Sequence, residues 1–68
     1  MCMKYSYEAA CRKAAQLGAL IESGKEWTRA RGFPSAEVAW YFQTQFNGME
    51  SVGAFPDENG QGFSVDFR

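Results

Sequence analysis

The chain has 68 residues, which is room for one domain and no more. It contains no histidine, so His-containing zinc sites and nucleophiles activated by a histidine base are excluded. Seven Lys and Arg stand against eight Asp and Glu, and this formal charge of −1 gives no global basic field of the kind that nucleic-acid and membrane-surface proteins carry. With 46% hydrophobic and 16% aromatic residues, the composition is typical of a globular domain with a core.

The two cysteines, Cys2 and Cys11, are expected to be free thiols in a reducing cytoplasm. Charged residues near the start of the chain occupy the place where a signal peptide has its apolar region. No apolar run is long enough to span a bilayer. We therefore expect a cytoplasmic protein without membrane contact.

The first predicted element is a helix over residues 7–22. Ser6 is placed to cap its start and Gly24 to end it. Apolar and small residues follow helical spacing. They are Tyr7, Ala10, Cys11, Ala14, Leu17, Gly18 and Ile21. The middle of this stripe is small, which predicts close approach of another element.

Two shorter helices are predicted next. The run Ser-Gly-Lys-Glu at 23–26 has the spacing of a capping box, which predicts a helix over residues 24–31. A turn follows at 32–35, where Pro34 disfavours helix for the preceding residue and Ser35 can cap the next helix. That third helix is predicted over residues 36–46.

The last third of the chain predicts an antiparallel β-hairpin over residues 51–67. The pair Asn59-Gly60 suits a type I′ turn, and a four-residue loop over 57–60 keeps the same strand faces. Pairing outward from the turn places apolar residues opposite one another on one face. The pairs are Pro56 with Phe63, Ala54 with Val65, and Val52 with Phe67. The other face, which carries Phe55, is mostly polar.

The predicted fold class is α+β: a small single domain, 1–68, with two or three short helices followed by a C-terminal hairpin. This order resembles the winged helix-turn-helix superfamily over residues 7–67. The resemblance places residues 36–46 as the recognition helix and residues 57–61 as the tip of the wing. It implies major-groove reading by the exposed side of residues 35–44.

The charge distribution argues against an ordinary DNA-binding version of that fold. Residues 1–31 carry six basic and three acidic groups, a net +3, and residues 32–68 carry one basic and five acidic groups, a net −4, which together give −1. Phosphate binding needs Lys and Arg. None occurs between Gly32 and Phe67, so a DNA footprint would use Lys25, Arg29 and Arg31 together with Ser35, Gln43 and Thr44.

Two candidate surfaces remain. One is a basic and aromatic patch, in which Lys25, Arg29 and Arg31 surround Trp27; its alternative is a Trp that caps the core among solvated charges. The other is an outward set on the third helix and the open face of the hairpin. It comprises Trp40, Tyr41, Thr44 and Phe55. Its neighbour is either internal, the hairpin or the N-terminal segment as a third strand, or external, a second copy or a foreign protein.

We expect a small non-enzymatic protein-binding module, an adaptor or inhibitor of the kind that bacteria, phages and mobile elements encode, with a protein partner or a homodimer as its complex. Trp40, Tyr41 and Phe55 would be its anchors. The alternative is a winged-helix-like DNA-binding transcriptional regulator. We expect no catalytic residue, metal ion or cofactor in either case.

Overall fold

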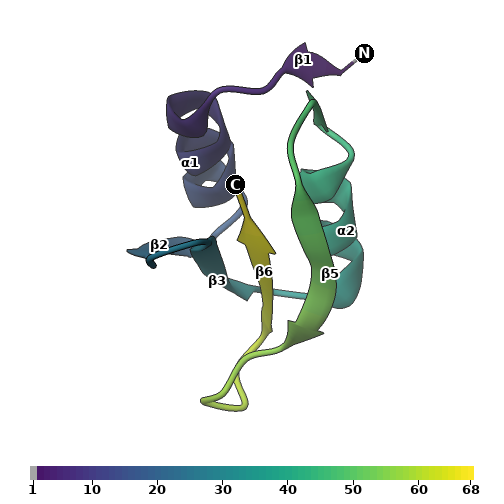
Figure 1. Ribbon diagram of the computed structural model, residues 1–68. Coiled ribbons are helices and arrows are strands. Elements are labelled where there is room, and N and C mark those ends of the chain that lie inside the picture. Colours follow the sequence, from purple (N-terminus) through teal and green to yellow (C-terminus); the bar gives the residue numbers. More distant parts are fainter. Residues whose placement is uncertain (1) are drawn as a thin grey trace.

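Two helices pack on one face of a four-stranded antiparallel sheet with strand order β2-β3-β6-β5, and a short parallel pair, β1 with β4, lies outside it (Figure 1). This is a computed structural model, and it describes residues 2–68. The elements in chain order are β1 (Met3–Lys4), α1 (Tyr7–Gln16), β2 (Leu20–Ser23), β3 (Thr28–Phe33), α2 (Ala36–Gln43), β4 (Phe46–Asn47), β5 (Ser51–Pro56) and β6 (Phe63–Phe67).

Helix α1 begins where the sequence predicts and ends earlier. The Ser6 hydroxyl accepts a hydrogen bond from the Ala9 amide at 3.1 Å, the expected cap. Gly18 has a φ of 93°, a left-handed conformation in which glycine avoids a steric penalty, and the helix stops just before it. The predicted end at residue 22 is therefore wrong, because Gly18 leaves the helix although its spacing continues the apolar stripe.

The predicted helix over residues 24–31 is wrong, since this segment closes a hairpin between β2 and β3. Ser23 pairs with Thr28, so the run that resembles a capping box ends β2 at Ser23 and forms the turn after it. Along β3, Thr28 and Ala30 are buried while Arg29 and Arg31 lie on the other face. That alternation has the period of a strand, and the burial of Thr28 and Ala30 against the core outweighs the local capping signal.

Helix α2 starts as predicted after Ser35, whose hydroxyl accepts a hydrogen bond from the Val38 amide at 3.2 Å. It ends at Gln43 and not at residue 46. Phe46–Asn47 instead forms β4 and pairs in parallel with β1. The N-terminal segment thus pairs with β4, and it does not join the C-terminal hairpin as a third strand.

The C-terminal hairpin is present over the predicted residues, but its outer register is wrong. Pro56 pairs with Phe63 as predicted, whereas Ser51 pairs with Phe67 in place of Val52. The cause is an irregularity between Val52 and Phe55, where an extra residue opposes β6 and moves Val52 to the open face. The connection spans residues 57–62, and Asn59 lacks the positive φ of a type I′ turn.

The core lies between the helices and the sheet and is built around three fully buried rings. Phe42 of α2 lies 5.3 Å from Phe33 of β3 and 5.5 Å from Phe67 of β6, centroid to centroid. Ala10 and Ala14 are fully buried on α1. The small stripe predicted for the first helix therefore serves ordinary core packing.

The predicted order of helices followed by a C-terminal hairpin is wrong, because the chain runs β-α-β-β-α-β-β-β. The winged-helix resemblance rested on that order, with residues 25–31 as the first helix of the motif, and the segment directly before the turn at 32–35 is strand β3. Neither helix in this part of the chain is long and apolar enough to cross a membrane.

Candidate functional site

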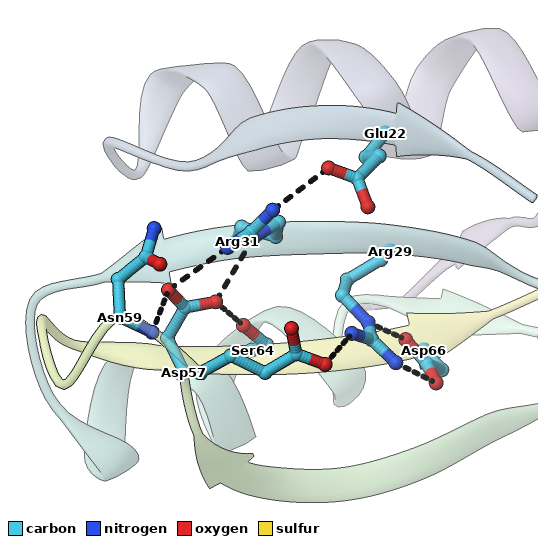
Figure 2. A network of polar contacts seen from close by, with 8 residues as sticks. Glu22, Arg29, Arg31, Asp57, Asn59, Ser64 and Asp66 are labelled. Carbon is cyan, nitrogen blue, oxygen red and sulfur yellow. Dashed lines mark hydrogen bonds and ion pairs between the residues drawn. The ribbon is translucent and has the colours of Figure 1, made fainter.

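The open face of the sheet, which the helices do not cover, carries two arginines from β3 in a network of carboxylates. Arg31 donates from Nε and Nη2 to the two Oδ atoms of Asp57 at 2.9 and 3.2 Å, and from Nη1 to Glu22 Oε2 at 2.8 Å. Figure 2 shows Arg31 between these carboxylates, with Asp57 reaching it from the loop after β5. A bidentate pair of this kind fixes orientation as well as charge.

Asp57 is the most buried carboxylate of this network, with 5% of its side chain exposed. Its carboxylate also accepts from Ser64 Oγ at 2.8 Å and from the Asn59 amide at 3.2 Å. The hydrogen bonds from Arg31 and Ser64 hold the pKa of Asp57 well below its usual range. Asp57 thus pins the loop to β3 and β6, in a role the sequence analysis missed.

Arg29 forms the second half of the network. It donates from Nε and Nη2 to Asp66 at 2.8 and 3.3 Å and from Nη1 to Glu58 at 3.3 Å. Its guanidinium carbon lies 5.2 Å from the centroid of the Phe55 ring. The hydrogen bond to Asp66 is the main cause that raises the pKa of Arg29. The open face is therefore occupied by charges that are already paired.

The basic and aromatic patch predicted around Trp27 is brought together in part: Lys25, Trp27 and Arg29 line one depression, and Arg31 does not. Arg29 and Arg31 point into the carboxylate network, and the guanidinium over the Trp27 ring belongs to Arg68, 4.4 Å from its centroid. This depression is shallow, has a volume of about 410 Å³, and is lined as well by Glu22, Glu26 and Asp66. Its lining mixes both signs of charge.

The outward aromatic set divides between two faces. The ring of Trp40, a residue of α2, packs against β5 so closely that a Cβ added at Gly53 would lie 2.8 Å from its atom Cη2. Trp40 is nevertheless 54% exposed. Tyr41 is also about half exposed, and Lys13 Nζ of α1 stands 5.5 Å from its ring centroid. Thr44 is exposed at the C-cap of α2, where Oγ1 donates to the Tyr41 carbonyl.

Phe55 lies apart from these three residues. It is on the open face beneath Arg29, opposite Ser64 of β6. The structure therefore brings Trp40, Tyr41 and Thr44 together with exposed Glu37 on one side of α2. We call these four residues the outer face of α2.

Of the six residues assigned to the DNA-binding alternative, all except Lys25 have an internal hydrogen-bond partner within residues 2–68. Ser35 caps α2, and the Gln43 side chain accepts from Ser51 Oγ at 2.8 Å and donates to the Ala39 carbonyl. Arg29 and Arg31 hold carboxylates. A phosphate would have to compete with each of these contacts.

No group of three or more Cys, Asp or Glu side chains within residues 2–68 is arranged to hold a metal ion. Both Cys2 and Cys11 are free thiols. Comparisons of the chain with protein-family models, with curated proteins and with solved structures found no match. The function is therefore argued from the surfaces of the molecule.

Proposed function

We propose that this protein is a small non-enzymatic protein-binding module whose partner contacts the outer face of α2, with Trp40 as the anchor. The observation that supports this most strongly is a large ring, 54% exposed, held on a helix against the backbone of Gly53. Trp and Tyr are enriched among residues that dominate binding energy, and a ring fixed before binding loses little conformational entropy.

The open face of the sheet is less suited to this role. Its arginines already hold three carboxylates from β6 and the 57–62 loop, Asp57, Glu58 and Asp66. A partner would have to desolvate these pairs, and that desolvation offsets most of the gain from new contacts. Charge pairing thus favours the outer face of α2.

The same pairing is why we prefer protein binding to DNA binding. Affinity for DNA comes largely from Lys and Arg that neutralise phosphates and release counterions. Arg29 and Arg31 would have to exchange carboxylates that are fixed within the fold for a phosphate. The proposal retains a cytoplasmic location, with which two free thiols are consistent.

The test is affinity capture from the source organism with wild-type protein, Trp40→Ala and Leu20→Ala as baits. Leu20 is a matched control because it is 78% exposed on β2, in a different element from Trp40. We expect Trp40→Ala to lose a partner that wild type and Leu20→Ala both retain. Removal of a hot-spot Trp weakens binding by at least about thirtyfold, equivalent to 2 kcal/mol.

Folding of each bait is checked by its amide NMR spectrum, which should stay dispersed in Trp40→Ala because half of the ring is already exposed. A second copy of the chain as partner would appear as concentration-dependent sedimentation of wild type that Trp40→Ala abolishes. A folded Trp40→Ala bait that captures the same proteins as wild type would overturn the proposal.

A further inference from the structure

Strand β5 forms an edge of the sheet and has one free side. It pairs with β6 alone, and Figure 1 shows it at the end of the sheet with α2 beside it. Glu50 and Arg68 exchange both of their backbone hydrogen bonds, each at 2.9 Å. In an antiparallel ladder the next residue points its N–H and C=O away from the partner strand, so Ser51 presents both groups at the free edge.

This edge lacks the charged side chains that commonly prevent strand pairing. None of the residues of β5 is charged, and the irregularity after Val52 and the missing N–H of Pro56 restrict pairing to the first half of the strand. The opposite edge, β2, is shorter and carries Glu22, which Arg31 holds. The two edges therefore differ in their readiness to accept a strand.

Exposed apolar side chains lie on both sides of the free half of β5. Trp40 covers the helix side at Gly53. Val52 lies on the open side opposite Asp66 and is 48% exposed. Side chains of an extended segment alternate between the two faces, so a strand beside β5 would contact Trp40 and Val52 in turn, whereas a partner helix would reach only one.

We propose that the partner supplies an extended segment that adds to the free edge of β5 as a fifth strand, with apolar side chains against Trp40 and Val52 and a Lys or Arg near Glu37. This inference rests on the proposed function and names its partner class. Glu37 precedes Trp40 by three positions, so the two lie on the same side of α2, and Glu37 makes no ion pair within residues 2–68.

Charge makes a second copy of the chain a poorer occupant than a foreign segment. A second β5 is uncharged and is flanked by Glu50 and Asp57, so it would offer Glu37 no cation. A segment of alternating apolar residues that ends in Lys or Arg provides both contacts.

The experiment selects binders from a displayed library of random decapeptides on the full chain and then synthesises the tightest. Two N-methylated versions of that peptide are made, one methylated along each backbone edge. We expect one version to lose binding by about tenfold or more and the other to bind like the parent, because only one edge donates to β5. Val52→Lys should weaken binding similarly, and Leu20→Lys on the opposite edge strand should not.

The second readout is amide hydrogen exchange of wild type with and without the parent peptide. Ser51 should exchange at least about tenfold more slowly in the complex, since its N–H gains a partner. The edge-strand inference fails if both methylated peptides bind like the parent, if Ser51 exchange is unchanged, or if no peptide is selected. The proposed function still stands in the first two cases when Trp40→Ala abolishes binding, and it fails when Trp40→Ala binds normally. Slower Ser51 exchange on concentrating the free protein would assign the edge to a second copy.

Discussion

At the scale of single residues, Asp57 is the polar side chain that holds the 57–62 loop on the sheet. It joins the 57–62 loop to β3 through Arg31 and to β6 through Ser64, and it is nearly buried. In the variant Asp57→Asn, the Arg31 guanidinium would face an amide group in place of a carboxylate. Removing one partner of a buried ion pair lowers the stability of the fold, because the other charge is left without compensation.

Asp57→Asn is therefore expected to unfold at clearly lower denaturant than wild type at pH 7. Because the folded-state pKa of Asp57 is depressed, its stabilisation is fully present above the unfolded-state pKa of about 4 and is lost as the pH falls through the folded-state value. The difference between wild type and variant should thus be constant from pH 7 to about 5 and shrink below about pH 4.

The control is Glu58→Gln, which removes one negative charge from the same loop. Glu58 is 77% exposed, and its contact with Arg29 is at 3.3 Å, so we expect a change within about 0.5 kcal/mol. Equal losses in the two variants, or a difference for Asp57→Asn that does not change between pH 7 and 3, would show that Asp57 is not the anchor described above.

Residue-level roles were only partly predictable from the sequence. The outward position of Trp40 follows from helical spacing and is observed. The role of Asp57 depends on Arg31, which is 26 positions away and comes near it only once β3 pairs with β6. Such a pairing cannot be derived from local spacing. The alternation of Thr28, Arg29, Ala30 and Arg31 was the available signal.

At the scale of elements, the starts of the helices could be predicted from the sequence more reliably than their ends. The starts were also easier to predict than whether a segment forms a helix or a strand. The caps Ser6 and Ser35 act within three residues, so they can be identified in the sequence. The segment 20–33 has both a capping-box spacing and a strand alternation. The structure follows the alternation, since β2 and β3 complete the sheet over the core.

Ser35→Ala should lower the free energy of unfolding by about 1 kcal/mol, because the Val38 amide loses its acceptor at the start of α2. Urea denaturation at neutral pH measures this. Ser23→Ala is the matched control: its segment also resembled a helix cap, but it lies in the last position of β2, and we expect a smaller effect. A larger loss for Ser23→Ala than for Ser35→Ala would contradict the assignment of the two serines.

At the scale of the whole molecule, folding brings the basic and the acidic parts of the chain into contact. Arg29 and Arg31 of the basic part meet Asp57, Glu58 and Asp66 of the acidic part across the open face. The sheet face, where four carboxylates surround two arginines, thus differs in character from the outer face of α2, where two aromatic rings are about half exposed. Composition alone gave no sign of this division.

The central claim is that partners bind at the outer face of α2 and the free edge of β5. Its most direct test is an amide NMR titration of wild type with a captured partner or selected peptide, in which each shifted signal is assigned. We expect the largest shifts at Trp40, Tyr41 and Ser51 and small shifts at Arg29 and Arg31. Large shifts confined to Arg29, Arg31 and the 57–62 loop would contradict the claim and move the binding site to the open face of the sheet.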